Sequence, residues 1–349
     1  MMLDDRIANI FTEYNQNDAF SGVFSVRNSD GVMYEQACGY RNRAEKLSNE
    51  ISTAFGIASG TKLFTGLAIC KLIDEGKLVL ADKVWDIVPY DLKMINKDVT
   101  VFHLLTHTAG LGEYIDEESP DSNDNMISLY KRYPVYLWDS LTYYLPMFSD
   151  IPAKFKPGER FEYSNDGYIL LGLVIEAISG MRCQDYVTEQ IIRPCGLTHT
   201  EFYRLDRLPH NTAYGYLYDG RLDEWYSNIY RMPIIGGSDG GLFTCASDLD
   251  KLWRAVFSGH ILSDAMHMEW IMPRIEMGDE KGHFYGFGMY QYKAAAANIY
   301  YAVGCDYGVE FFSMFIPQHG IVASALGNTE MDTRPLLEQL FSIEWEYMI

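Results

Sequence analysis

Ser59 and Lys62 are the pair of residues in this sequence with the clearest capacity for covalent chemistry. They lie at the start of an apolar segment, residues 61–75, that predicts a buried helix, and a spacing of three places both side chains on one face. A serine hydroxyl needs an adjacent base, and lysine is that base only when neutral. Burial and the positive end of the helix dipole both favour the neutral amine. The Ser59 backbone N–H would then stabilise an oxyanion.

The Ser-x-x-Lys spacing is weak evidence by itself. It occurs by chance about once in a chain of this length, and Ser128 and Lys131 also have it. That second pair follows an acidic, Asn-rich stretch, residues 113–125, that we expect to be an exposed loop, and Pro134 comes soon after it. We interpret it as a solvated surface pair. Taken alone, the Ser59 pair is equally consistent with a helix cap beside a surface lysine.

A second polar motif is Tyr163-Ser164-Asn165, which opens an amphipathic helix predicted over residues 165–179 with Gly180 as its stop. There a phenol and an amide can both point into a cleft. The phenol can carry a proton between nucleophile and leaving group, and the amide can hold a carbonyl. A buried aromatic at a helix cap is the alternative for Tyr163. Two further segments share the Tyr-x-Asn spacing: Tyr226-Ser227-Asn228, without a helix pattern after it, and Tyr40-Arg41-Asn42, at an expected strand end.

Together these motifs resemble the serine β-lactamase and penicillin-binding-protein superfamily, and within it the class C β-lactamase branch with its D,D-peptidase and esterase relatives. The resemblance covers roughly residues 20–330 in the expected order and rests on four segments: Ser59-Gly-Thr-Lys62, His103-Leu-Leu-Thr-His107-Thr-Ala-Gly-Leu111, Phe155-Lys-Pro-Gly-Glu-Arg-Phe-Glu-Tyr-Ser-Asn165 and Gly240-Gly-Leu-Phe-Thr-Cys-Ala-Ser-Asp-Leu249. It implies that Ser59 is the acylated nucleophile, that Lys62 and Tyr163 move protons, and that Asn165 orients substrate. It implies acyl transfer to water without metal or organic cofactor.

A third family element departs from the pattern. The family carries a Lys or His, a small residue and a Gly on the strand beside the nucleophile. Read without gaps, Cys305 stands at the cation position and Tyr307 at the glycine position. Cys305 cannot hold a substrate carboxylate by charge, which weakens the expectation of β-lactam or D-Ala-D-Ala recognition more than that of acyl transfer. Gly308 is the candidate for a second oxyanion N–H, with its register open by a residue or two.

Three alternatives remain. Gly236-Gly-Ser238-Asp-Gly240 matches the nucleophile elbow of α/β-hydrolases, although the residues after it suggest a strand, so we favour a glycine-rich turn. His103 and His107 are four apart and could share a metal, but no third ligand is evident, so helix packing is the preferred interpretation. The altered third element also fits a relative that binds a ligand without turnover.

Composition excludes several classes of protein. The 349 residues carry 28 basic and 48 acidic side chains, a net charge of −20, which disfavours nucleic acid and anionic membrane surfaces as partners. A small molecule or short peptide is the expected substrate, and the oligomeric state is not readable. Six scattered cysteines indicate reduced thiols. With no signal peptide or transmembrane segment in the sequence, we expect a cytoplasmic protein.

The pattern of elements predicts an α+β protein of the β-lactamase/transpeptidase type. A helix is expected over residues 3–15, a hairpin over 20–26 and 32–40, strands over 285–292, 298–303, 311–316 and 321–326, and a last helix from about Pro335. Residues 80–230 suggest mostly helices and long loops. We therefore expect an antiparallel sheet flanked by terminal helices, built from residues 1–60 and 231–349, with residues 61–230 as a mostly helical domain and the active site between them.

Overall fold

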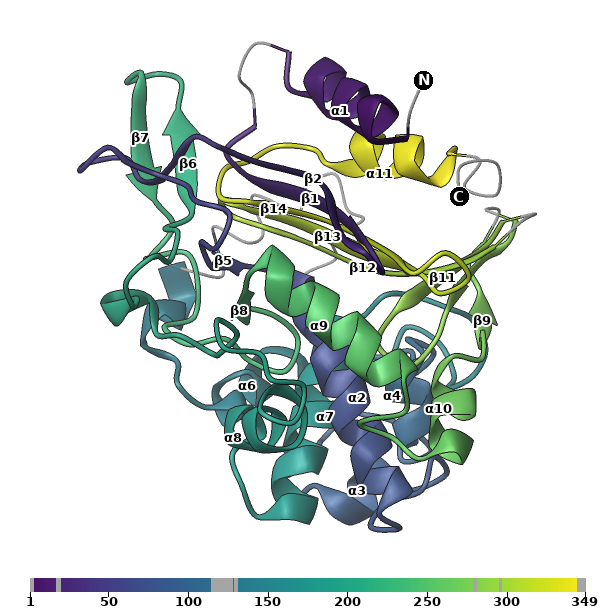
Figure 1. Ribbon diagram of the computed structural model, residues 1–349. Coiled ribbons are helices and arrows are strands. Elements are labelled where there is room, and N and C mark those ends of the chain that lie inside the picture. The colour runs from purple at the N-terminus through teal and green to yellow at the C-terminus, as the bar shows by residue number, and fades with distance from the viewer. Residues whose placement is uncertain are drawn as a thin grey trace.

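An eight-stranded antiparallel sheet forms the centre of the computed structural model, which describes residues 3–16, 20–113, 128, 131–278, 281–294 and 297–343 (Figure 1). The strand order is β2-β1-β14-β13-β12-β11-β10-β9. The strands are β1 (Gly22–Asn28), β2 (Gly31–Cys38), β9 (Ile275–Glu276), β10 (His283–Tyr285), β11 (Tyr290–Lys293), β12 (Asn298–Asp306), β13 (Val309–Ile316) and β14 (Ile321–Gly327). Because β1 pairs with β14, strands from the two ends of the chain are neighbours in the sheet.

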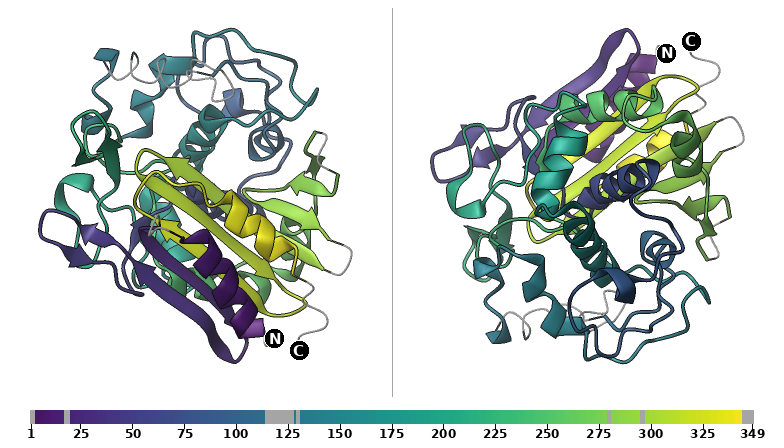
Figure 2. Two further views of the ribbon diagram at one scale, coloured as in Figure 1. Left: turned by 90° about the horizontal axis from the view of Figure 1, so that it is seen from above. Right: turned by 90° about the horizontal axis from the view of Figure 1, so that it is seen from below.

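Helices cover both faces of this sheet. Helices α1 (Leu3–Tyr14) and α11 (Arg334–Phe341) lie together on one face, and α2 (Thr61–Asp74) and α9 (Ala246–Phe257) lie on the other (Figures 1 and 2). The remaining described α-helices are α3 (Val84–Ile87), α4 (Val101–Leu105), α6 (Leu145–Phe148), α7 (Asn165–Ser179), α8 (Cys183–Val187) and α10 (Asp264–Trp270). Strands covered on both faces need apolar side chains on both, and every residue of β13 and β14 is buried.

Short elements connect the sheet to the helices. Single turns of 3-10 helix occur at η1 (Ala58–Gly60), η2 (Val135–Leu137), η3 (Leu141–Tyr143) and η5 (Leu205–Arg207), and a π-turn at η4 (Thr188–Ile192). Three two-stranded ribbons pair β3 (Tyr40–Asn42) with β4 (Leu47–Ser48), β5 (Phe55–Gly56) with β8 (Phe243–Thr244), and β6 (Tyr216–Asp219) with β7 (Glu224–Ser227). The β5–β8 pair joins the segment before Ser59 to the glycine-rich segment that ends at Gly241.

Helix α2 is buried around most of its circumference, as its apolar sequence predicts. Two glycines permit its close approach to the turn between β10 and β11. A Cβ atom on Gly66 would lie 2.4 Å from the Phe287 carbonyl oxygen, and one on Gly288 would lie 2.4 Å from the Lys62 carbonyl oxygen. The helix therefore lies deep enough in the molecule to bury the side chain of Lys62.

The predicted fold class is confirmed, and most predicted elements are present. Helix α7 and its left-handed cap Gly180 have the predicted bounds. The single strand expected over residues 285–292 is wrong, because a turn at residues 286–289 separates β10 from β11. Most of the acidic stretch 113–125 lies outside the described residues. The division into two domains stays a prediction, since one hydrophobic core extends from the sheet through α2 to α7.

Within the described residues, no helix combines the length and the apolar character needed to cross a lipid bilayer.

Trp253 links α9 to the sheet, and its contacts allow a test of this packing. Its indole donates to Ser313 Oγ at 2.9 Å, which lies 2.8 Å from Ser324 Oγ, and all three side chains are buried. Trp253→Phe leaves this hydroxyl pair without its indole donor and opens a cavity, so we expect the free energy of unfolding to fall by about 1–3 kcal/mol. Urea denaturation measures it. Trp225→Phe, at a partly exposed tryptophan, should change stability by less than about 0.5 kcal/mol; equal losses in both variants would contradict a special role of the Trp253 indole in holding α9 to the sheet.

Candidate active site

Ser59 sits in a strained connection between β5 and α2. The turn η1 contains Ser59, and the preceding Ala58 has φ +44°, a left-handed conformation that is costly for a residue with a side chain. Flanking hydrogen bonds hold this conformation: Ile57 N–H donates to the Leu242 carbonyl at 2.9 Å, and Gly60 N–H donates to the Ile57 carbonyl at 2.8 Å. The hydroxyl of Ser59 is thereby placed at the surface of a cleft while the chain around it is buried.

Lys62 lies one turn further on, and its amine contacts Ser59 directly. The Nζ atom is 3.0 Å from Ser59 Oγ, 2.7 Å from Asn165 Oδ1 and 2.7 Å from the Asp239 carbonyl oxygen. Lys62 is only 2% exposed, so these polar partners replace water around a group that would otherwise be costly to bury. The structure thus brings Ser59, Lys62 and Asn165 together.

Tyr163 and Asn165 reach the same place from the start of α7. Ser164 caps this helix by accepting from Gly167 N–H, which directs the residues on either side of it toward Lys62. The Tyr163 ring centroid lies 4.9 Å from Lys62 Nζ. Ser59, Tyr163 and Asn165 all line one open cleft of about 1100 Å³.

His107 holds the Tyr163 segment in position, a role that helix packing does not describe. It follows the end of α4 with φ +56°, outside the helix. Its carbonyl accepts from Glu162 N–H at 2.9 Å, and its Nδ1 accepts from Ser164 N–H at 3.0 Å, so it is bonded on both sides of Tyr163. The His107 and Tyr163 ring centroids are 4.5 Å apart. His107 bonds the backbone of a segment 57 residues away in the sequence, so no local sequence pattern could have predicted this contact.

The protonation state of His107 follows from its surroundings. Burial lowers the pKa of His107 well below its usual value, and the neighbouring Lys62 acts in the same direction. Because Nδ1 accepts a hydrogen bond, the ring proton is on Nε2, which has no partner among the described residues. His107 is therefore a neutral acceptor and not a base. His103 caps α4 together with Thr100, whose N–H donates to His103 Nδ1 at 3.2 Å.

Strand β12 approaches Ser59 at Gly304. A Cβ atom there would lie 2.2 Å from the Ile57 carbonyl oxygen and 2.9 Å from Ser59 N, so only glycine fits. This corrects the predicted register: Gly304 occupies the glycine position of the third element, and the cation position two residues earlier is Ala302. Gly308 lies in the β12–β13 turn, packed against Gly215 and Tyr216 and not against Ser59. Cys305 lines the cleft as expected.

The ladder of β12 also determines the edge of the strand to which the N–H of Cys305 points. Residues 307–308 form a two-residue turn, so Asp306 and Val309 are a hydrogen-bonded pair, and Gly304 pairs in the same way with Phe311. The N–H of the intervening Cys305 therefore points to the opposite edge of β12. The strand β11 occupies that edge only as far as Tyr301. Beyond Tyr301, the edge of β12 to which Cys305 N–H points is not paired with β11.

Ser238, the alternative nucleophile, and the second Ser-x-x-Lys pair, Ser128 and Lys131, do not line the Ser59 cleft among the described lining residues. Ser238 is fully buried, and its Oγ packs against Gly172. Residues 236–240 form the favoured glycine-rich turn, which leads to β8 and not to a helix, so the geometry that an α/β-hydrolase needs is absent there. Ser128 and Lys131 are both exposed, as expected of a surface pair.

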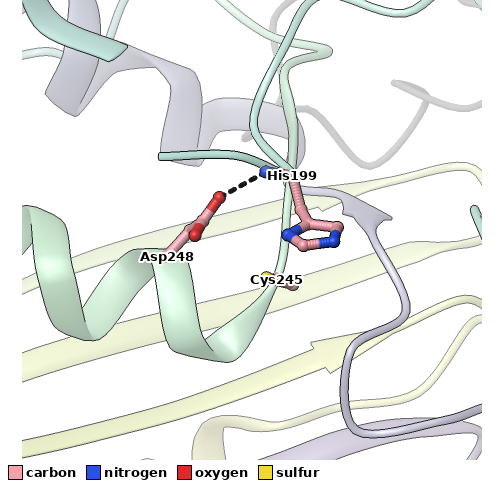
Figure 3. A group of neighbouring side chains, drawn as sticks. All are labelled: His199, Cys245 and Asp248. Atoms are coloured by element: carbon pink, nitrogen blue, oxygen red, sulfur yellow. Dashed lines mark hydrogen bonds between the residues drawn. The ribbon is translucent and has the colours of Figure 1, made fainter. Parts of the chain in front are cut away.

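Among the described residues, one group of side chains outside the cleft has metal-ligand chemistry: His199, Cys245 and Asp248, whose ligand atoms lie within 4.8 Å of one another (Figure 3). The Asp248 carboxylate already accepts from His199 N–H at 2.6 Å, from Thr200 Oγ1 at 3.0 Å and from Lys251 Nζ at 2.9 Å. Burial raises the pKa of the Cys245 thiol, which disfavours the thiolate. These contacts explain the group as an anchor of the 199–200 segment on α9, and we assign no metal to it.

Comparison with known proteins gives consistent matches. A family model described as Beta-lactamase matches residues 7–339. A penicillin-binding protein of Bacillus subtilis (strain 168) is 30% identical over 292 residues, which are 80% of this chain and 61% of that protein, so the chain spans about three fifths of this relative. The crystal structure of a penicillin-binding protein from Bacillus halodurans is 34% identical, with a TM-score of 0.86, and covers 96% of this chain and 98% of its own.

A more distant structure shares the fold. The D-amino acid amidase from Ochrobactrum anthropi SV3, complexed with L-phenylalanine amide, has a TM-score of 0.78 at 19% identity and covers 97% of this chain and 96% of its own.

The position of His107 predicts a graded mutational effect on the reactivity of Ser59. His107→Leu removes the acceptor for Ser164 N–H, whereas His107→Asn keeps an acceptor and tolerates the positive φ. Losing one buried hydrogen bond costs about 1–3 kcal/mol, so we expect His107→Leu to slow fluorophosphonate labelling of Ser59 about tenfold or more and His107→Asn clearly less. His103→Leu serves as the matched control. Equal rates for His107→Leu and wild type would refute the positioning role.

The lowered pKa of His107 also predicts a pH dependence of stability. As the pH falls below about 6.5, the unfolded chain takes up a proton that folded His107 does not. Its contribution is therefore full above about pH 6.5 and is lost below it, with a slope of up to about 1.4 kcal/mol per pH unit. Between about pH 6 and pH 5, the free energy of unfolding of His107→Asn should change less steeply with pH than that of wild type, by up to about 1.4 kcal/mol per pH unit. Urea titrations at several pH values measure it, and an unchanged slope would contradict the assignment.

Proposed function

The chain belongs to the Beta-lactamase family, and from this premise we propose that it is a serine hydrolase that forms a covalent acyl-enzyme on Ser59 with an ester, amide or lactam. The observation that carries the proposal is the distance of 3.0 Å between the buried Lys62 amine and the hydroxyl of Ser59 at the cleft. No other described serine that we considered as nucleophile combines a buried base with access to a cleft.

The partners of Lys62 explain how its amine acts as the base. A neutral amine has two N–H donors and one lone pair. Asn165 Oδ1 and the Asp239 carbonyl oxygen can only accept, so they take the two N–H groups and leave the lone pair facing Ser59. When Ser59 Oγ bonds to the substrate carbonyl carbon, its proton passes to Lys62 Nζ. The resulting ammonium then has three acceptors, so the charged intermediate is also satisfied.

The backbone supplies the oxyanion site in this proposal. In the proposed reaction, the N–H groups of Ser59 in η1 and of Cys305 on β12 stabilise the carbonyl oxygen as it becomes negative. Collapse of the tetrahedral adduct expels the leaving group, and Tyr163 carries the proton from Lys62 to it. Water then attacks the Ser59 ester, releases the acid and restores the hydroxyl. Asn165 holds Lys62 in place and presents its amide to the substrate.

A second candidate is a protein that is acylated, or binds a ligand, without turnover. It is favoured by β12, which has Ala302-Val303-Gly304 where the family carries a cation, a small residue and glycine. The loss of that cation removes a carboxylate contact but leaves Ser59, Lys62 and the two N–H groups intact. The two candidates differ in deacylation, so an assay of turnover separates them.

Labelling with a fluorophosphonate tests the nucleophile. We expect a single adduct on wild type by intact mass spectrometry, located on the peptide that contains Ser59. Ser59→Ala should lose the label and lower the hydrolysis of p-nitrophenyl acetate by about 10³-fold or more. Ser238→Ala, a matched serine deletion, should retain the label. A label on Ser238, or unchanged labelling of Ser59→Ala, would refute the proposal. A stable adduct with penicillin or an ester, and no product release, would favour the binding protein.

A further inference from the structure

Acidic side chains outnumber basic ones along the described lining of the Ser59 cleft. The acidic residues are Glu113, Glu162, Glu310, Asp332 and Glu338, and the basic ones are Lys154 and Arg334. Both basic side chains are paired with acids of the same cleft: Lys154 Nζ lies 2.5 Å from Glu162 Oε1, and Arg334 lies 2.9 Å from Asp332 Oδ2. An incoming carboxylate would have to compete with these pairs, whereas an ammonium group would meet a negative potential.

Strand β12, beside Ser59, adds no positive charge that would offset the excess of acidic side chains in the cleft. In the register that the structure shows, Ala302 stands where the family carries a cation. In the register predicted from the sequence without gaps, Cys305 stands there. Neither residue carries a positive charge. The Cys305 thiol instead hydrogen-bonds the buried Glu310 carboxylate, which also accepts from Thr333 N–H and Oγ1. Lys62 is buried and occupied by Ser59, Asn165 and the Asp239 carbonyl, and the proposed reaction begins from its neutral form.

An aromatic cluster forms another part of the same lining. It consists of His283, Tyr290, Tyr292, Tyr301 and Phe341, from β10, β11, β12 and α11. Their rings pack against one another, with centroids 4.4 Å apart for His283–Tyr292, 5.2 Å for Tyr290–Tyr301 and 5.4 Å for Tyr292–Phe341. Such a surface can bury an aromatic or large apolar group, and exposed ring faces also attract cations.

Resting on the proposed function, we propose that the Ser59 cleft selects acyl donors that carry an ammonium group and an aromatic or large apolar group, and discriminates against donors with a carboxylate near the reacting carbonyl. Donors with a carboxylate are disfavoured because acidic side chains outnumber basic ones in the cleft and because β12 carries no cation. The aromatic cluster supplies the contact for the apolar group. This preference is opposite in sign to that of a site built to hold a substrate carboxylate.

Three matched compounds test the charge preference: D-phenylalanine p-nitroanilide, its N-acetyl derivative and its N-succinyl derivative. At about pH 6.5 the free α-amine is mostly protonated, so the three carry a positive, a neutral and a negative group on one skeleton. We expect kcat/KM to fall in that order, with about tenfold or more between the first and the last. Raising NaCl from about 20 mM to about 500 mM should compress the ratio, because salt screens the field of the cleft.

Protection of Ser59 from fluorophosphonate labelling by the three corresponding phenylalanine amides gives the same order without requiring turnover. If Ser59 is not labelled at all, the proposed function fails. If Ser59 is labelled and the succinyl compound is cleaved or protects as well as the free amine, this inference fails and the proposed function stands.

Charge variants locate the preference in the cleft. The double variant Glu113→Gln with Glu338→Gln removes two cleft acids and should lower the ammonium-to-carboxylate ratio several-fold. The control, Glu224→Gln with Glu276→Gln, changes the net charge equally at exposed residues of β7 and β9 that do not line the cleft. An equal effect of both double variants would assign the preference to the net charge of the protein and overturn the proposal.

Discussion

The buried amine of Lys62 is the group on which the rest of the site depends. A lysine that is 2% exposed is tolerated only where fixed polar groups replace its water. Here the partners come from three separate segments: η1, the start of α7, and the glycine-rich turn before β8. Each of these segments is itself held by other elements, so the position of one nitrogen atom constrains much of the helical part of the protein.

The sheet provides the rigid wall against which this group is assembled. Pairing of β1 with β14 joins the two chain ends within it, and β12 approaches η1 so closely that Gly304 has no room for a side chain. Gly66 of α2 and Gly288 of the β10–β11 turn likewise leave no room for a side chain where these two segments meet. Close backbone contacts of this kind restrict the position of Ser59, and the proposed acyl transfer depends on precise positioning of the reacting groups.

In the proposed function, different residues carry the chemistry and the specificity of this site. Ser59, Lys62, Tyr163 and Asn165 lie on the helical side, whereas the residues that would recognise a carboxylate lie on β12 and have lost their cation. A substitution on β12 can therefore alter which substrates are accepted without disturbing the proposed proton transfer through Lys62 and Tyr163. The acid-rich, aromatic lining of the cleft is consistent with this separation.

Local sequence determined the parts of the site that depend on short spacing. The Ser59–Lys62 pair on one helix turn, the helix opened by Tyr163-Ser164-Asn165 and the flanking hairpins all follow from periodicity and capping, which act within a few residues. Tertiary structure alone decided the rest: the Asp239 carbonyl as a partner of Lys62, the two-sided contact of His107 with the Tyr163 segment, and the register that puts Gly304 and not Gly308 beside Ser59. These contacts join residues about 50 to 250 positions apart, and backbone carbonyls and strand registers have no residue type of their own to reveal them.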